Sequence, residues 1–63
     1  MAKWNMAQTG GYDYRDSHHA LQGYVLRSGK QWLGVPLVTG QLKYFPTIRE
    51  AQLYVETMIA LES

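Results

Sequence analysis

The sequence predicts a single α+β domain, in which a three-stranded antiparallel β-sheet packs against one C-terminal α-helix behind an N-terminal tail. The chain has 63 residues, which is enough for one small domain. Two X-Gly dipeptides separate short β-rich runs between positions 20 and 45, as expected for successive β-hairpins. Apolar residues then recur at helical spacing from position 48 onwards.

The three expected strands are short and follow one another directly. Ser28-Gly29 and Thr39-Gly40 are predicted as two-residue turns, so the strands cover residues 20–27, 30–38 and 41–45. Pro36 lies inside the second strand and has no N–H to donate. It therefore has to face an edge or a gap in the sheet.

Opposed residues on antiparallel strands share a face of the sheet, so the turns also predict two faces. One face is almost entirely apolar: Tyr24, Leu26, Leu33, Val35, Leu37, Leu42 and Tyr44. The other is mixed: Leu21, Gly23, Val25, Arg27, Lys30, Trp32, Gly34, Pro36, Val38, Gln41, Lys43 and Phe45. We expect the helix to cover the apolar face and to leave the mixed face open.

The C-terminal helix is expected over about 48–61. Thr47 and Glu50 fit a capping box, in which each side chain bonds the backbone N–H of the other residue. The residues expected to face the sheet are Ile48, Ala51, Tyr54, Val55, Met58 and Ile59.

Residues 1–19 are expected to be an N-terminal tail or arm, and residues 20–63 the βββα domain. Trp4, Met6, Tyr12 and Tyr14 make this segment more apolar than a solvated tail needs. It either packs back onto the domain or becomes ordered on a partner.

Composition argues against several classes of protein. The chain has no Cys, which excludes disulfides and thiolate metal sites and fits a reducing compartment. It shows no secretory signal pattern and no apolar run long enough to cross a bilayer, so we expect it in the cytoplasm. His18 and His19 are adjacent, and no catalytic or metal-ligating set completes them. We predict a protein that is not an enzyme and uses no metal or cofactor.

Charge is unevenly distributed along the chain. All five acids lie outside residues 17–49, where the only charged side chains are Arg27, Lys30, Lys43 and Arg49. Cations beside the aromatic Trp32 on an open sheet face would neutralise phosphates and reach base edges. Together with Arg15 in the N-terminal segment, these residues predict a surface for double-stranded DNA.

Two stretches resemble a known small DNA-binding module. Gly29-Lys30-Gln31-Trp32 and Phe45-Pro46-Thr47-Ile48-Arg49-Glu50-Ala51-Gln52-Leu53-Tyr54 are similar to the strand-two and helix-entry motifs of AP2-type factors. They are also similar to those of the arm-binding N-terminal domains of phage integrases. The resemblance covers about residues 20–60 and implies that the strands lie in the major groove, with Arg27, Lys30, Trp32 and Lys43 touching the DNA. Pro36 and the small number of cations depart from that pattern.

Two functions follow as alternatives. The first is a phage- or plasmid-type accessory or regulatory protein that binds double-stranded DNA. The second is a protein-binding module, such as a phage-encoded inhibitor of a host protein, which uses Trp32 and the aromatic N-terminal tail. A homodimer formed through an edge strand or through the apolar part of the mixed face is a third possibility.

Overall fold

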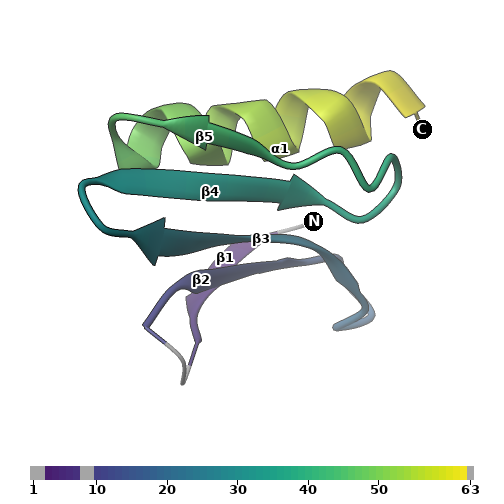
Figure 1. Cartoon of the computed structure of the whole chain (residues 1–63). Helices are drawn as coiled ribbons and strands as arrows, with labels where there is room; N and C mark the ends of the chain where they lie inside the picture. Colours follow the sequence, from purple (N-terminus) through teal and green to yellow (C-terminus); the bar gives the residue numbers. More distant parts are fainter. Residues whose placement is uncertain (1–2, 8–9, 63) are drawn as a thin grey trace.

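The structure, a computed structural model, describes residues 3–7 and 10–62. Five antiparallel strands pair in chain order and one helix follows them (Figure 1). The elements are β1 (Lys3–Met6), β2 (Tyr12–Arg15), β3 (Leu21–Ser28), β4 (Gln31–Pro36), β5 (Lys43–Phe45) and α1 (Ile48–Glu62). The predicted α+β class, with a C-terminal helix on an antiparallel sheet, is confirmed, but the sheet has five strands rather than three.

The two additional strands come from the segment expected to be a tail, of which residues 1, 2, 8 and 9 lie outside the described residues. Tyr12 pairs with Val25 of β3, so β2 continues the sheet. The rings of Trp4 and Tyr14 lie 4.7 Å apart, and the indole N–H of Trp4 donates a 2.7 Å hydrogen bond to Glu56 of α1. Of the two readings of this segment, packing back onto the domain is the one observed.

Both central hairpins are displaced by two residues from the predicted pairing. Ser28 pairs with Gln31, so the turn is Gly29-Lys30. Gly29 has φ of 61°, which fits a type II′ turn with glycine at its first central position. Gly34 pairs with Lys43, which makes the β4–β5 connection six residues long, 37–42. Because side chains alternate with period two, a shift of two leaves the residues that lie within the strands on their predicted faces.

Pro36 is the last residue of β4, and its missing N–H does not interrupt the pairing of β4 with β3. The next N–H, that of Leu37, donates to Gln22 O in β3. The nitrogen of Pro36 therefore points to the other side, where β5 is too short to reach. The proline lies at a gap in the sheet, as expected.

The helix covers the mixed face of the sheet, and the prediction that it would cover the apolar face is wrong. Val25, Ala51 and Val55 form the buried cluster, and Trp32 and Phe45 pack against it. Two glycines on this face explain why the helix packs there. A Cβ on Gly23 would lie 2.6 Å from Val55 Cγ1, and one on Gly34 would lie 3.0 Å from Ala51 O. Without side chains at these positions, the helix backbone comes close to the sheet.

The N-terminus of α1 is close to the predicted position. The hydroxyl of Thr47 accepts a hydrogen bond of 3.3 Å from the backbone N–H of Glu50, which satisfies one of the first amides of the helix. The helix ends one residue later than expected. Within residues 3–7 and 10–62, no helix is both long enough and apolar enough to cross a membrane.

Candidate interaction surface

The open face of the sheet is the surface that α1 does not cover. We define it by five side chains from the three strands β3, β4 and β5: Tyr24, Leu26, Leu33, Val35 and Tyr44. Register brings them together, because Tyr24 pairs with Val35, Leu26 with Leu33, and Leu33 with Tyr44. None belongs to the cluster under the helix. Tyr44 remains 50% exposed, whereas the other members are partly buried or, in the case of Val35, buried.

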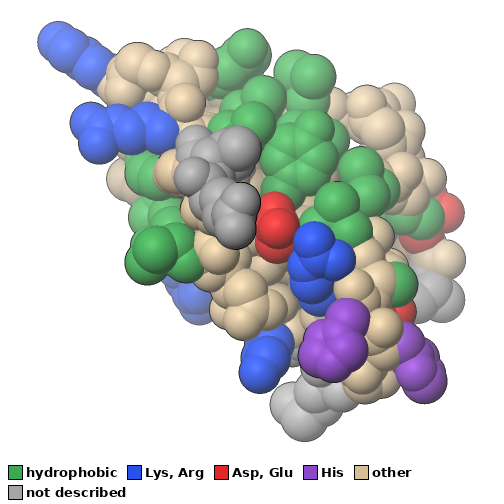
Figure 2. All heavy atoms as spheres, turned by 90° about the horizontal axis from the view of Figure 1, so that it is seen from below, with side chains coloured by type: hydrophobic (Ala, Val, Ile, Leu, Met, Phe, Trp, Pro, Cys, Tyr) green, Lys and Arg blue, Asp and Glu red, His purple; other side chains and the backbone are tan. Residues whose placement is uncertain are grey.

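Apolar exposure continues beyond the strands. Leu37 and Leu42, in the β4–β5 connection, are also exposed. Figure 2 views the molecule from below the orientation of Figure 1, in which α1 lies at the top. It shows hydrophobic side chains next to one another, with several Lys and Arg side chains at the margin. Contiguous apolar exposure of this kind is typical of interaction sites.

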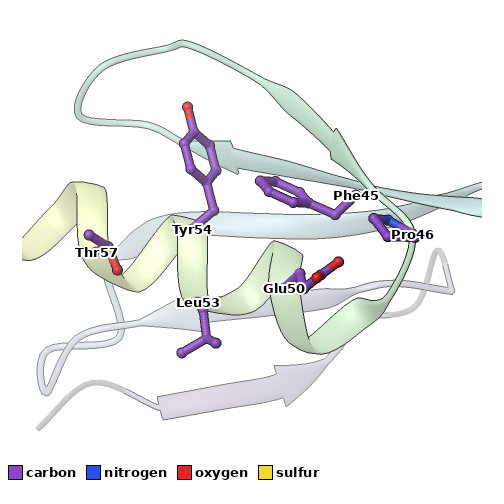
Figure 3. Close-up of a pocket in the computed structure, with 6 residues that line it drawn as sticks. All are labelled: Phe45, Pro46, Glu50, Leu53, Tyr54 and Thr57. Atoms are coloured by element: carbon purple, nitrogen blue, oxygen red, sulfur yellow. The ribbon is translucent and has the colours of Figure 1, made fainter.

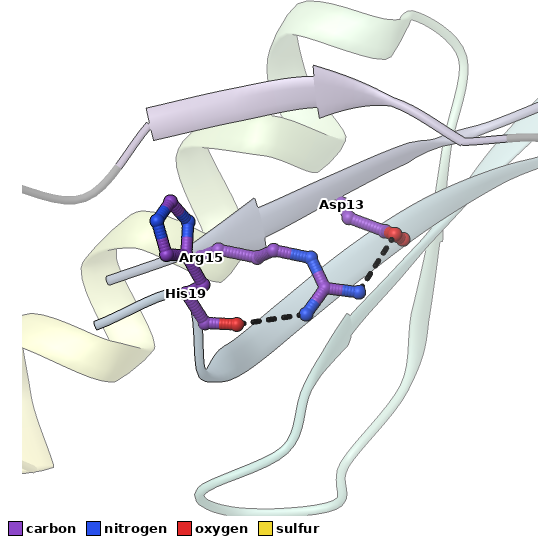
Figure 4. Close-up of polar contacts among 3 residues, drawn as sticks. All are labelled: Asp13, Arg15 and His19. Carbon is purple, nitrogen blue, oxygen red and sulfur yellow. Dashed lines mark hydrogen bonds and ion pairs between the residues drawn. The ribbon is translucent and has the colours of Figure 1, made fainter. Parts of the chain in front are cut away.

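A polar margin borders the open face on the β2 side. Asp13 pairs with Tyr24 in register, and its carboxylate lies 3.4 Å from the guanidinium of Arg15. Arg15 also donates to the backbone carbonyl of His19 at 2.9 Å (Figure 4). Arg15, one of the predicted DNA contacts, is therefore engaged within the chain. The ion pair leaves this margin without net charge.

Trp32 does not lie on an open surface. It faces α1, is partly buried and packs against the core cluster. The aromatic rings of the N-terminal segment, Trp4 and Tyr14, pack on the same side. Both functional alternatives assumed that the face carrying Trp32 is open. That face lies largely beneath α1, because the helix packs on the side of the sheet that contains the glycines.

The other predicted site residues are exposed but do not share one open face. Lys43 lies beside α1, with its ammonium nitrogen 5.9 Å from the centre of the Tyr54 ring. Arg27, at the end of β3, pairs with Trp32, and Lys30 is in the adjacent turn. Arg49 is in the first turn of α1. Figure 1 shows the β3–β4 turn and the start of α1 at the same end of the molecule, so Arg27, Lys30 and Arg49 all belong to segments at that end.

A cleft of about 540 Å³ lies between the end of β5 and the outer side of α1 (Figure 3). Its walls are Phe45, Pro46, Glu50, Leu53, Tyr54 and Thr57. The hydroxyl of Tyr54 is used within the chain, since it donates to Gln41 O at 2.7 Å. Glu50 and Thr57 are two helical turns apart, a rise of about 10 Å. The carboxylate of Glu50 is therefore too far from the hydroxyl of Thr57 to act as its general base.

Two titratable groups have shifted pKa values, and both shifts have structural causes. The N–H of Ala20 donates to Asp16, as does the N–H of His18, and these bonds hold the pKa of the carboxyl below its usual 3.8. Burial, followed by the nearby charge of Glu56, raises the pKa of Tyr14. Among the described residues, no three His, Cys, Asp or Glu side chains are grouped so that they could hold a metal ion.

The members of the open face were grouped correctly from the sequence, and only the side that receives the helix was mistaken. The glycines at positions 23 and 34 were the available signal, since glycine marks close approach of another backbone. Comparisons with protein-family models, with curated proteins and with solved structures gave no match.

Proposed function

We propose that this protein is a non-catalytic protein-interaction module that binds a partner through the open face of its sheet. The observation that carries the proposal is the exposure of Tyr44 on β5, beside the part-buried Tyr24 and Leu33, on the side that α1 leaves uncovered. The exposed Leu37 and Leu42 of the β4–β5 connection add to the apolar surface. The five side chains carry no charge, so the complementary surface is an apolar, uncharged patch of a protein. Such a patch, bordered by polar groups, has the layout of a protein–protein interface.

Site-specific photo-crosslinking in the cell that produces the protein tests this proposal. A benzophenone amino acid replaces Tyr44, which lies on the open face, or Thr57, which is exposed on the outer side of α1. We expect a discrete cross-linked protein product from position 44 and none from position 57. If position 44 gives no protein product, or if both positions give the same products, the open face is not the binding surface.

DNA binding is a second candidate, supported by the three exposed cations at one end of the molecule. Arg27, Lys30 and Arg49 would contact phosphates there, in place of the sheet surface that the resemblance implied. Three phosphate contacts give a slope of about −3 for log affinity against log salt. The expected affinity is correspondingly low.

A gel shift across salt concentrations tests this second candidate. The double variant Arg27→Glu and Lys30→Glu should lose retention of duplex DNA. Lys3→Glu, a matched exposed cation on β1 towards the opposite end of the sheet, should retain it. If the wild type shows no retention at low salt, or if Lys3→Glu weakens binding equally, the basic end is not a DNA site.

A further inference from the structure

The buried core of this domain consists of small side chains, with larger, partly buried ones such as Trp32 and Phe45 packed against it. The buried hydrophobic side chains among the described residues are Val25, Val35, Ala51 and Val55, none larger than valine. Domains below about 70–80 residues rarely gain more than ~3–5 kcal/mol from a single core. They usually add disulfides, a structural metal or oligomerisation. The sequence has no Cys, and the part of the chain that the structure describes has no metal-binding cluster. Of the routes that small scaffolds use, oligomerisation is the one that an uncovered apolar face can supply.

The chemistry of the open face suits a second copy of the same chain. In a two-fold dimer the same surface of both copies is in contact, so any net charge on it would repel the identical charge on the other copy. The five side chains of the open face are uncharged, and the neighbouring Asp13 and Arg15 are paired with each other. Apolar side chains therefore meet apolar side chains, and the polar margin remains at the periphery.

The geometry of the sheet also fits. The sheet has five strands, and β3 has eight residues. The other strands have only 4, 4, 6 and 3 residues, so at ~4.8 Å between strands and ~3.3 Å per residue one face covers on the order of 400 Å² in projection. Each partner in a standard interface contributes about 800 Å² of accessible surface, and accessible surface exceeds projected area because side chains protrude. The face therefore lies at the lower end of the size range of specific interfaces, and the exposed Leu37 and Leu42 of the β4–β5 connection extend it.

We infer that the protein forms a two-fold dimer in which the open faces of two sheets stack, with both α1 helices on the outside. The inference rests on the proposed function and names the partner at that surface as a second copy. Two sheets in such an arrangement pack about 10 Å apart, with their side chains interdigitating. Tyr24, Leu33 and Tyr44 of each copy would then become core residues of a four-layer structure, joining Val35, which is already buried in the single chain.

Sedimentation and concentration-dependent melting test the dimer. The wild type should have twice the 7.2 kDa mass of the chain, and its melting temperature should rise with concentration because the association stabilises the folded state. Tyr44→Lys should give a 7.2 kDa species that keeps its helical circular dichroism. The matched control is Leu53→Lys, because Leu53 is 44% exposed, similar to Tyr44, but lies on α1 away from the open face. It should remain dimeric.

A wild-type monomer at NMR concentrations, with a melting temperature independent of concentration, would overturn the dimer. So would a Leu53→Lys variant that dissociates as readily as Tyr44→Lys. Photo-crosslinking from position 44 distinguishes a failure of the dimer from a failure of the proposed function. A product of twice the chain mass supports the dimer. A product with a different protein overturns the dimer but keeps the interaction module, and the absence of any product removes both.

Discussion

Substituting Gly23 by alanine tests the assignment of the helix to the glycine-bearing face. The new methyl group would lie 2.6 Å from Val55 Cγ1 and 2.8 Å from the carbonyl oxygen of Val35. Val55 is fully buried and cannot move into solvent, and the second contact is with the backbone of the adjacent strand. Either α1 moves away from the sheet or β3 and β4 separate locally.

The expected cost can be worked out from these contacts. Overpacking a filled core usually costs about 1–3 kcal/mol. Replacing glycine by alanine also stabilises the protein by about 0.4–1 kcal/mol, because the unfolded chain loses conformational freedom. The expected net loss is about 1–2 kcal/mol, a large part of the roughly 3–9 kcal/mol available to a chain of this length. The melting temperature should fall by about 5–15 °C.

Thermal melts at one fixed protein concentration measure this loss, since self-association also changes the melting temperature. Ser28→Ala, at an exposed position of the same strand, is the control and should melt like the wild type. Combining Gly23→Ala with Val55→Ala removes one of the two close contacts. The double variant should therefore be more stable than the sum of the single losses predicts, by at least ~0.5 kcal/mol. An unchanged or raised melting temperature for Gly23→Ala, or strict additivity with Val55→Ala, would refute the reasoning.

Three further predictions concern the helix cap, the N-terminal hairpin and pH. Thr47→Ala should lower stability by about 1 kcal/mol, because the N–H of Glu50 loses its acceptor; a denaturant midpoint equal to that of the wild type would contradict this. Trp4→Phe keeps an aromatic ring, although a smaller one, but removes the donor to Glu56, and should cost about 1.5–3 kcal/mol, measured by urea unfolding; a loss no larger than for Lys3→Ala would show that this bond contributes little. The folded-state pKa of Asp16 lies below its unfolded value, so its stabilisation is present above the unfolded pKa and is lost as pH falls through the folded pKa. In an NMR titration its carboxyl carbon should have a midpoint below 3.8, and a midpoint at or above that value would contradict the assignment.

Local sequence signals determined the elements within the C-terminal two thirds of the chain. The Thr47 and Glu50 pair located the start of α1, because capping depends on residues only three positions apart. The alternation of side chains determined which strand residues share a face, and this survived a two-residue error in both registers because the period is two. The N-terminal strands were missed although Trp4 and Met6, like Tyr12 and Tyr14, alternate with polar residues. Runs of four residues are too short for that pattern to stand out.

Tertiary packing alone decided which face of the sheet receives the helix. Apolar content ranks the Tyr24 and Leu33 face as the better partner for α1, because burial free energy scales with apolar area. The helix instead lies on the face that contains Gly23 and Gly34, because close approach depends on the space that opposing backbones leave. That space is a property of two elements brought together, and neither segment of sequence specifies it alone. The apolar face was left open as a consequence, and it is from this surface that we argue the protein's function.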